Sequence, residues 1–150
     1  MTDRLRAVFD TNVFISAFLS RNPSSPTQEL IRRWMANEYD LLVSDALIDE
    51  LATKLQEKGI ADERIAEFMA LLSKLAERID VTPEAVVSAI IQDPDDDAIL
   101  ACAVVGAADY LVTYDPHFDV LGGSYQGIEI VKAVPFLWAL RGDADRTHVS

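Results

Sequence analysis

The chain has 150 residues, half of them apolar and a quarter charged, which is typical of one soluble globular domain with its own core. Charged residues interrupt every apolar run, so we expect no membrane-spanning segment, and no signal-peptide pattern precedes the first apolar run. The single cysteine, Cys102, excludes an internal disulfide and lies in an apolar run, so we expect a small buried side chain in a cytoplasmic protein.

The net charge of −12 and the pI of about 4.4 disfavour a nucleic-acid partner, because cationic side chains drive binding to phosphates. Net charge does not describe local patches, however. Arg32 with Arg33, or Lys54 with Lys58, would provide cationic ones. A divalent cation would also neutralise acids that cluster around it.

Short apolar runs alternate with longer helical patterns along the chain. In chain order we expect a strand over 5–9, helices over 11–19 and 26–37, a strand over 41–43, a helix ending at Gly59, helices over 62–76 and 98–108, and strands over 110–113 and 128–131. Thr11 or Asn12 is the candidate N-cap of the first helix. The two helices on either side of Gly59 are expected to form an antiparallel pair.

This alternation is typical of an α/β fold with a central, mainly parallel sheet, here of about five strands. Residues 84–91 are compatible with a short helix or with a strand-like connection. Residues 122–127 are expected to be a flexible connection, because they lack the strand-to-helix context of a phosphate-binding loop. We expect one domain over 1–141 and a polar, frayed tail over 142–150.

Four acids are expected at or just beyond the carboxyl ends of the strands. Asp10 ends the first strand, and Asp115 follows the strand over 110–113 by two residues. Glu50 lies in the second turn of the helix after the second strand, and Asp96 in the first turn of a later helix. Ligand crevices of parallel sheets lie at this edge, so these side chains are expected to converge.

Converging carboxylates raise one another's pKa, and a hard divalent cation removes that cost. Mg²⁺ and Mn²⁺ prefer oxygen ligands, lower the pKa of a bound water and stabilise charge on a phosphate under attack. Acids at separate strand ends therefore predict metal-assisted hydrolysis. The sequence offers no Ser/His or Cys/His arrangement that would supply a protein nucleophile instead.

Each acid also has a simpler explanation. Asp10 is a plausible helix cap, Glu50 a solvated helix residue and Asp115 a turn residue before a proline. The acidic run over 93–97 suits a helix N-terminus. Together these explanations require four independent coincidences at one edge of the sheet.

Four segments resemble, in order, the motifs of PIN domains: VFDTNV at 8–13, SDALIDEL at 44–51, DPDDDAILACA at 93–103 and LVTYD at 111–115. The similarity extends over nearly the whole chain, through residues 128–140, and implies a three-layer α/β/α fold. It also implies a set of metal-binding acids and a set of polar residues that orient them: Asp10, Glu50, Asp96 and Asp115, and Asn12, Ser44 and Thr113.

Three consecutive aspartates compete within the third motif. The family pattern places its acid three residues before Ile99, which selects Asp96. Asp93 would then cap the helix, and Asp97 would point away by roughly 100°, one helical step. Asp119 is a further candidate outer ligand.

The chain is most similar to bacterial and archaeal PIN proteins that act as toxin components of type II toxin–antitoxin systems, the VapC-like ribonucleases. This resemblance implies a Mg²⁺- or Mn²⁺-dependent endoribonuclease with an RNA substrate. It further implies an antitoxin protein as a partner, and a homodimer.

Three other functions are weighed against this one. A phosphatase of the haloacid-dehalogenase type needs a second Asp where Asn12 stands, and a receiver domain needs an acidic pair that the N-terminus lacks. A non-catalytic interaction module with a vestigial acid cluster stays open. His117 is expected to be a turn or surface residue rather than a general base, and Trp34 and Trp138 are expected to pack between helices or at a dimer face.

Overall fold

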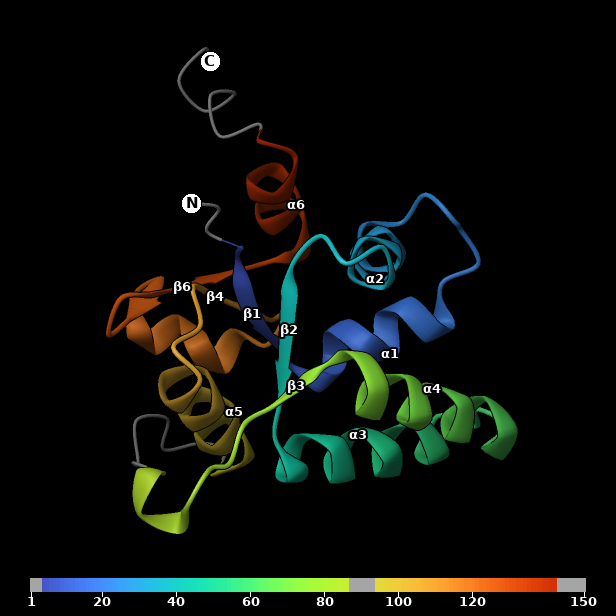
Figure 1. Ribbon diagram of the computed structural model, residues 1–150, viewed down its shortest axis with the longest axis horizontal. Coiled ribbons are helices and arrows are strands. Elements are labelled where there is room, and N and C mark those ends of the chain that lie inside the picture. The colour runs from blue at the N-terminus through green and yellow to red at the C-terminus, as the bar shows by residue number, and fades with distance from the viewer. Residues whose placement is uncertain (1–3, 87–93, 143–150) are drawn as a thin grey trace.

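The computed structural model describes residues 4–86 and 94–142, with only the backbone at 94 and 95. A sheet with the strand order β3-β2-β1-β4-β6-β5 forms its centre (Figure 1). The strands are β1 (Arg6–Phe9), β2 (Asp40–Val43), β3 (Glu77–Arg78), β4 (Tyr110–Val112), β5 (Ser124–Tyr125) and β6 (Ile128–Val131). All neighbouring strands are parallel except β5 and β6, which confirms the expected α/β class.

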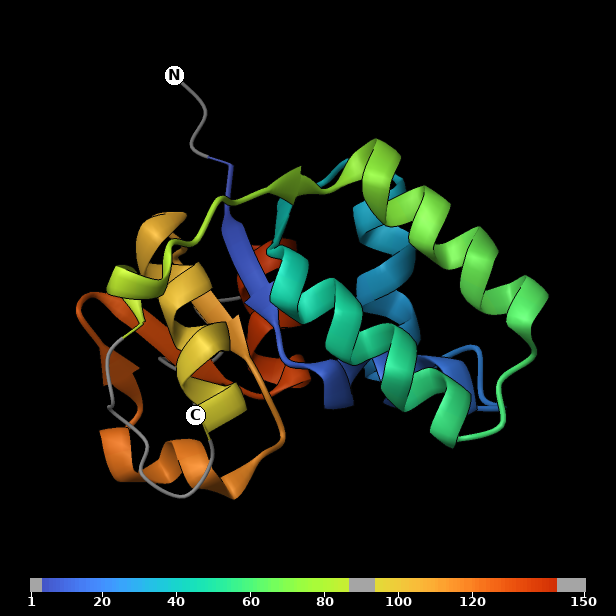
Figure 2. The same ribbon diagram turned by 90° about the horizontal axis from the view of Figure 1, so that it is seen from below.

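Helices connect the parallel strands. They are α1 (Thr11–Leu19), α2 (Pro26–Met35), α3 (Asp45–Glu57), α4 (Asp62–Leu75), α5 (Pro94–Val105) and α6 (Ala133–Arg141), with 3-10 helices η1 (Pro83–Ala85) and η2 (Pro116–Leu121). As expected, α3 and α4 form a helical pair, joined by a short loop that contains Gly59 at φ +79° (Figure 2).

Helices cover both faces of the sheet because its central strands are apolar on both sides. The ring of Phe9 on β1 packs against that of Phe136 on α6, with centroids 6.1 Å apart. The preceding residue, Val8, points to the opposite face. Its register partner Leu42 lies on that face beside Gly106, at the end of α5. The sheet therefore lies between α5 on one side and α6 on the other (Figures 1 and 2).

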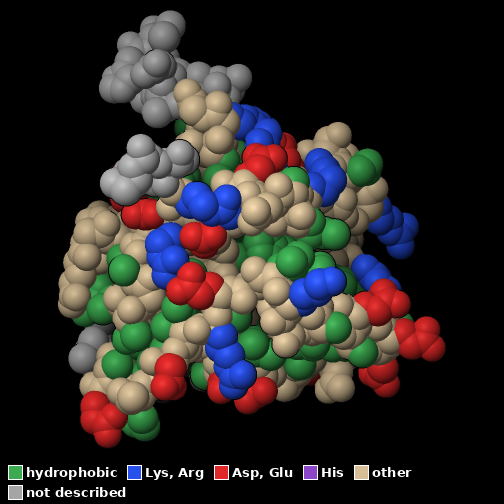
Figure 3. Space-filling model, in the orientation of Figure 1, with side chains coloured by type: hydrophobic (Ala, Val, Ile, Leu, Met, Phe, Trp, Pro, Cys, Tyr) green, Lys and Arg blue, Asp and Glu red, His purple; other side chains and the backbone are tan. Residues whose placement is uncertain are grey.

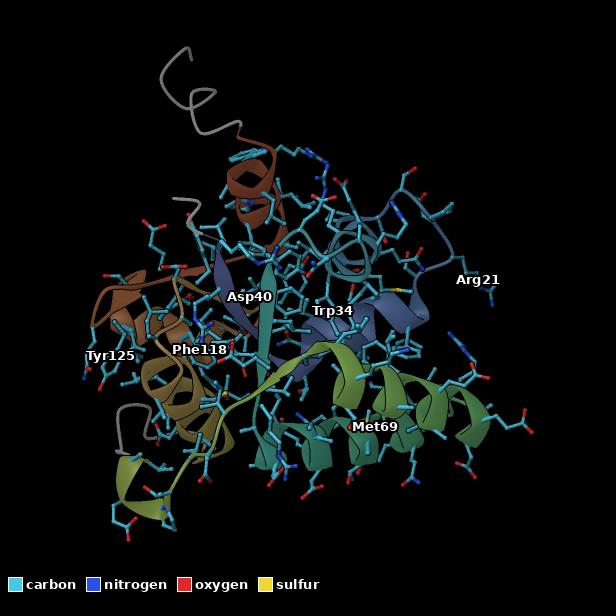
Figure 4. All side chains as sticks on the ribbon, in the orientation of Figure 1. Arg21, Trp34, Asp40, Met69, Phe118 and Tyr125 are labelled. Carbon is cyan, nitrogen blue, oxygen red and sulfur yellow. The ribbon has the colours of Figure 1, made fainter. Side chains whose placement is uncertain are left out.

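An aromatic cluster joins α4 to the first two helices. The ring of Phe68 on α4 lies 5.7 Å from that of Phe14, 5.0 Å from that of Phe18 and 6.2 Å from that of Trp34. Trp34 is 3% exposed and lies between α2 and α4 (Figure 4), which confirms its expected packing role. This cluster holds the α3–α4 pair against the body of the domain.

Cys102 on α5 is fully buried, and burial raises the pKa of its thiol to about 11, as suits a small core side chain. Within the described ranges, every helix is too short or too polar to cross a membrane.

The sheet has six strands rather than about five, because the edge strands β3 and β5 are two residues long. Strands this short leave no alternating pattern in the sequence. Residues 122–127, expected to be a flexible connection, instead form β5 and its turns. Gly122, Gly123 and Gly127 have φ of +71°, +93° and +84°, a region that glycine enters without strain.

Several expected boundaries differ. The N-cap of α1 is Asp10 rather than Thr11 or Asn12. Helix α5 begins at Pro94 and ends at Val105, three residues before the expected end. The segment over 84–91, which the sequence left open, contains part of η1. Three stretches lie outside the described residues: 87–91, the proposed cap Asp93 and the tail over 143–150. Gly142, in the left-handed conformation at φ +74°, ends α6.

Candidate functional site

Asp10 follows the last residue of β1 and is 3% exposed. Its Oδ1 accepts a hydrogen bond from the backbone N–H of Thr11 at 2.7 Å, so it caps α1. Its Oδ2 accepts one from Thr113 Oγ1, also at 2.7 Å. Burial raises the pKa of Asp10; these two hydrogen bonds oppose the shift, and the nearby charge of Asp115 adds to it. The site therefore holds this carboxylate at an electrostatic cost.

Thr113 connects Asp10 to Asp115. The parallel register pairs Phe9 with Val112, so Asp10 and Thr113 lie at the same level on adjacent strands. The hydroxyl of Thr113 that donates to Asp10 also accepts from the backbone N–H of Asp115 at 3.0 Å. One side chain thus positions both acids, as the resemblance implies.

Asn12 provides a second link between the same strand ends. Its Oδ1 accepts from the backbone N–H of Tyr114 at 3.2 Å, and its Nδ2 lies 3.4 Å from Asp10 Oδ2. Because the amide spans from α1 to the segment after β4, it fixes the start of α1 relative to that segment.

Glu50 reaches the site from α3. Ser44 ends β2, and its Oγ accepts from the backbone N–H of Leu47 at 3.2 Å, which caps α3. The side chain of Glu50 is 17% exposed, and Lys54 Nζ lies 3.8 Å from its Oε2 and 3.4 Å from Thr11 Oγ1. Ser44 therefore fixes the start of the helix that carries Glu50.

Asp96 enters from the first turn of α5 and is 3% exposed. Its Oδ2 lies 3.2 Å from His117 Nδ1, which also lies 3.4 Å from Asp115 Oδ1. Asp97 is buried too, at 6% exposed, but it does not line the hollow that contains Asp96. Of these two aspartates, Asp96 is the one that lines the hollow.

These four acids line one hollow of about 290 Å³ at the carboxyl edge of the sheet. Among the described residues, its lining is Asp10, Thr11, Asn12, Ile15, Glu50, Lys54, Glu57, Lys58, Asp96 and Asp115. A larger hollow of about 460 Å³ opens beside Ser44 and Arg78, and its described lining includes none of the four. The chemistry, not the volume, therefore marks the smaller hollow as the candidate site.

The donor set of this hollow fits a hard divalent cation. Carboxylates from four separate elements face one space, and oxygen ligands are those that Mg²⁺ and Mn²⁺ prefer. Lys54 adds one positive charge at the rim, but its side chain is 44% exposed and pairs with Glu50. A bound ion would offset the cost that the raised pKa of Asp10 reports.

The sequence interpretation missed two residues of the site. His117, expected to be a turn or surface residue, is 42% exposed, yet its ring nitrogen faces Asp96 and Asp115. Its position two residues after Asp115 was the available signal. Lys54 was noted only as part of a patch, although its place one helical turn after Glu50 puts both on one face of α3.

Two further acids were weighed as additional ligands. Asp119 is exposed and lines a neighbouring hollow with Asp115 and Lys132. Asp93 lies outside the described residues. Neither adds an observed contact to the acid cluster.

Comparisons with known proteins identify the family and the fold. A profile described as PIN domain matches residues 6–117. PAE2754 from Pyrobaculum aerophilum has a similar structure, with a TM-score of 0.63 at 13% identity over 93% of this chain and 90% of its own. A search of curated proteins finds no sequence match.

Two further solved structures share the fold. VapBC2 from Rickettsia felis, bound to a DNA fragment from their promoter, has a TM-score of 0.59 at 16% identity, covering 84% of this chain and 97% of the other. Mycobacterium tuberculosis VapC20, a sarcin-ricin loop cleaving toxin, has a TM-score of 0.55 at 17% identity, covering 82% and 98%. The profile matches most of the sequence, and the structure has the same fold as these solved structures. This chain therefore belongs to the PIN-domain family.

Proposed function

We propose that this protein is an endoribonuclease that uses Mg²⁺ or Mn²⁺ to hydrolyse RNA phosphodiester bonds. The observation that carries the proposal is the convergence of four carboxylates, from β1, α3, α5 and the segment after β4, on one hollow. Membership of the PIN-domain family supports it independently. All four acids of the family pattern are present, which favours a catalytic site over a vestigial one.

Asp10, Glu50, Asp96 and Asp115 would hold the ion. When bound, the ion lowers the pKa of a water molecule and stabilises the charge that develops on the phosphate. The protein's own contribution is to position these acids, through Thr113 between two strand ends and through the N-terminal turn of α5.

The strongly acidic composition limits how the protein would hold RNA. Figure 3 shows Lys and Arg side chains interspersed with Asp and Glu on one face, rather than gathered in a continuous basic patch. Lys54 and Lys58 line the hollow itself, where they would contact phosphates beside the cleaved bond. We therefore expect Lys54 and Lys58 to contribute to RNA binding beside the acids.

The biological role that we propose is that of a toxin held in check by an antitoxin protein, with a homodimer as the active assembly. Its support is the fold shared with VapC20, a toxin, and with VapBC2, together with the motif resemblance. Co-expression with the product of the adjacent gene tests this role. The expected result is relief of growth arrest and a stable complex of the two proteins.

The test of the nuclease is cleavage of a single-stranded RNA in Mn²⁺ or Mg²⁺. EDTA should abolish cleavage, and Asp10→Asn should reduce it by at least about a hundredfold, because a ligand to the ion is lost. Asp49→Asn removes a neighbouring exposed acid of α3 and should leave the rate unchanged. Cleavage that persists in EDTA would contradict the metal mechanism, and full activity in Asp10→Asn would contradict the site.

A further inference from the structure

The backbone at His117 is anchored beside the acids. His117 is the second residue of η2, and its backbone N–H donates to Asp115 Oδ1 at 2.9 Å. The next residue, Phe118, is 1% exposed and anchors η2 on the same side of the molecule as α5 (Figure 4). The imidazole is thus held over the acids by a capped turn and a buried neighbour.

The imidazole reaches two of the four acids from a third direction. His117 Nδ1 lies 3.2 Å from Asp96 Oδ2 and 3.4 Å from Asp115 Oδ1, and one ligand atom from each of the three residues lies within 4.8 Å of the others. In an octahedral site with bonds of about 2.1 Å, adjacent ligand atoms are about 3 Å apart. The two distances from His117 Nδ1, 3.2 and 3.4 Å, therefore match the spacing of adjacent ligands in one coordination sphere.

We propose that His117 Nδ1 is a direct ligand of the ion and makes this site prefer Mn²⁺ to Mg²⁺. The proposal rests on the metal-dependent function proposed above and names its cofactor more narrowly. Mg²⁺ is bound almost entirely by oxygen, whereas imidazole nitrogen suits first-row transition metals. Replacing one oxygen by nitrogen therefore shifts the balance between the two ions.

A different role for the same contact makes a different prediction. With a proton on Nδ1, His117 would donate a hydrogen bond to Asp96 and only orient it. In that case the nitrogen would not be bonded to the ion, although loss of the ring would still weaken binding. A measurement of the bond itself is therefore needed, in addition to an affinity.

Electron spin echo envelope modulation of the Mn²⁺-loaded full chain measures that bond, because a directly coordinated ¹⁴N modulates the echo. The wild type should show the modulation, and His117→Asn should lose it, since Asn presents an oxygen near the former Nδ1. His148→Asn removes the only other histidine of the chain and should keep it. A wild type without ¹⁴N coupling, or a His117→Asn variant that retains it, would overturn the proposal.

Isothermal titration calorimetry with each ion alone measures the preference of the site for Mn²⁺ over Mg²⁺. His117→Asn should weaken Mn²⁺ binding by at least about tenfold. Its Mg²⁺ affinity should change by less than about threefold, because Asn keeps an oxygen donor at that position. An equal loss for both ions would favour the orienting role and overturn the ligand assignment.

These measurements separate this proposal from the nuclease. If bound Mn²⁺ shows ¹⁴N coupling but the protein cleaves no RNA, the proposed nuclease function is refuted and His117 remains a ligand. RNA cleavage that depends on Asp10 and on the metal, without ¹⁴N coupling, would refute the ligand assignment alone.

Discussion

Asp10 is both a helix cap and a site acid. Its Oδ1 caps α1 by accepting a hydrogen bond from the backbone N–H of Thr11. Its Oδ2 accepts a hydrogen bond from Thr113 instead, and Asp10 lines the hollow. A residue needed only for capping has no reason to remain nearly fully buried beside another carboxylate. Its raised pKa is the electrostatic sign of the second role.

A prediction at the residue scale follows from that raised pKa. The folded-state pKa of Asp10 lies above its ordinary value of 3.8, so its contribution to stability is present below that pH and is lost as pH rises through the folded-state pKa. In EDTA at neutral pH, Asp10→Asn should therefore melt at a higher temperature than the wild type. The difference should shrink as pH falls towards 4.

Thermal melts across pH in EDTA measure this effect, with Asp49→Asn as the exposed control. A less stable Asp10→Asn variant at neutral pH would show that the hydrogen bonds of the carboxylate outweigh its burial. The same substitution should remove RNA cleavage, so stability and activity would change in opposite directions.

At the scale of elements, α3 and α5 bring their acids in by different means. Helix α3 begins at the Ser44 cap, which places Glu50 and Lys54 one turn apart along the hollow. Helix α5 lies flat on the sheet and presents Asp96 from its first turn. Its far end approaches β2 so closely that a Cβ at Gly106 would lie 2.8 Å from Leu42 Cδ1 and 3.0 Å from the backbone oxygen of Cys102.

Gly106→Ala should therefore destabilise the protein by about 1–3 kcal/mol, the usual cost of an overpacked core. Chemical denaturation measures the free energy of unfolding, and Leu42→Ala supplies the control. The double variant should be more stable than the sum of the single losses predicts, because the smaller side chain removes one clash. Strict additivity would mean that the contact with Leu42 is not the cause.

At the scale of the whole molecule, 25 acids oppose 13 lysines and arginines. Surface ion pairs offset part of this repulsion, as between Arg141 on α6 and Glu29 on α2 at 2.6 Å. The acid cluster has no comparable set of cations in its described lining, where the basic residues are Lys54 and Lys58. A bound divalent ion would therefore stabilise the entire fold.

Mn²⁺ should raise the melting temperature, because its binding stabilises the fold by RT ln(1 + [Mn²⁺]/Kd), about 2.7 kcal/mol at a free concentration one hundred times its Kd. Asp96→Asn should lose most of this gain, and Asp49→Asn should retain it. Sodium chloride at equal ionic strength is the control for general screening. A similar gain from both salts would show that the ion acts on net charge rather than at the site.

The local patterns determined the class of fold, the main helices and strands, and the two aspartates that follow strands, Asp10 and Asp115. Alternating apolar runs and strand-terminal aspartates are local properties of the chain, so the sequence alone is enough to predict them. Tertiary structure decided the two short edge strands. It also placed His117 against Asp96, because 21 residues and a turn of η2 separate them and only the packing of η2 beside α5 brings the ring to the acids.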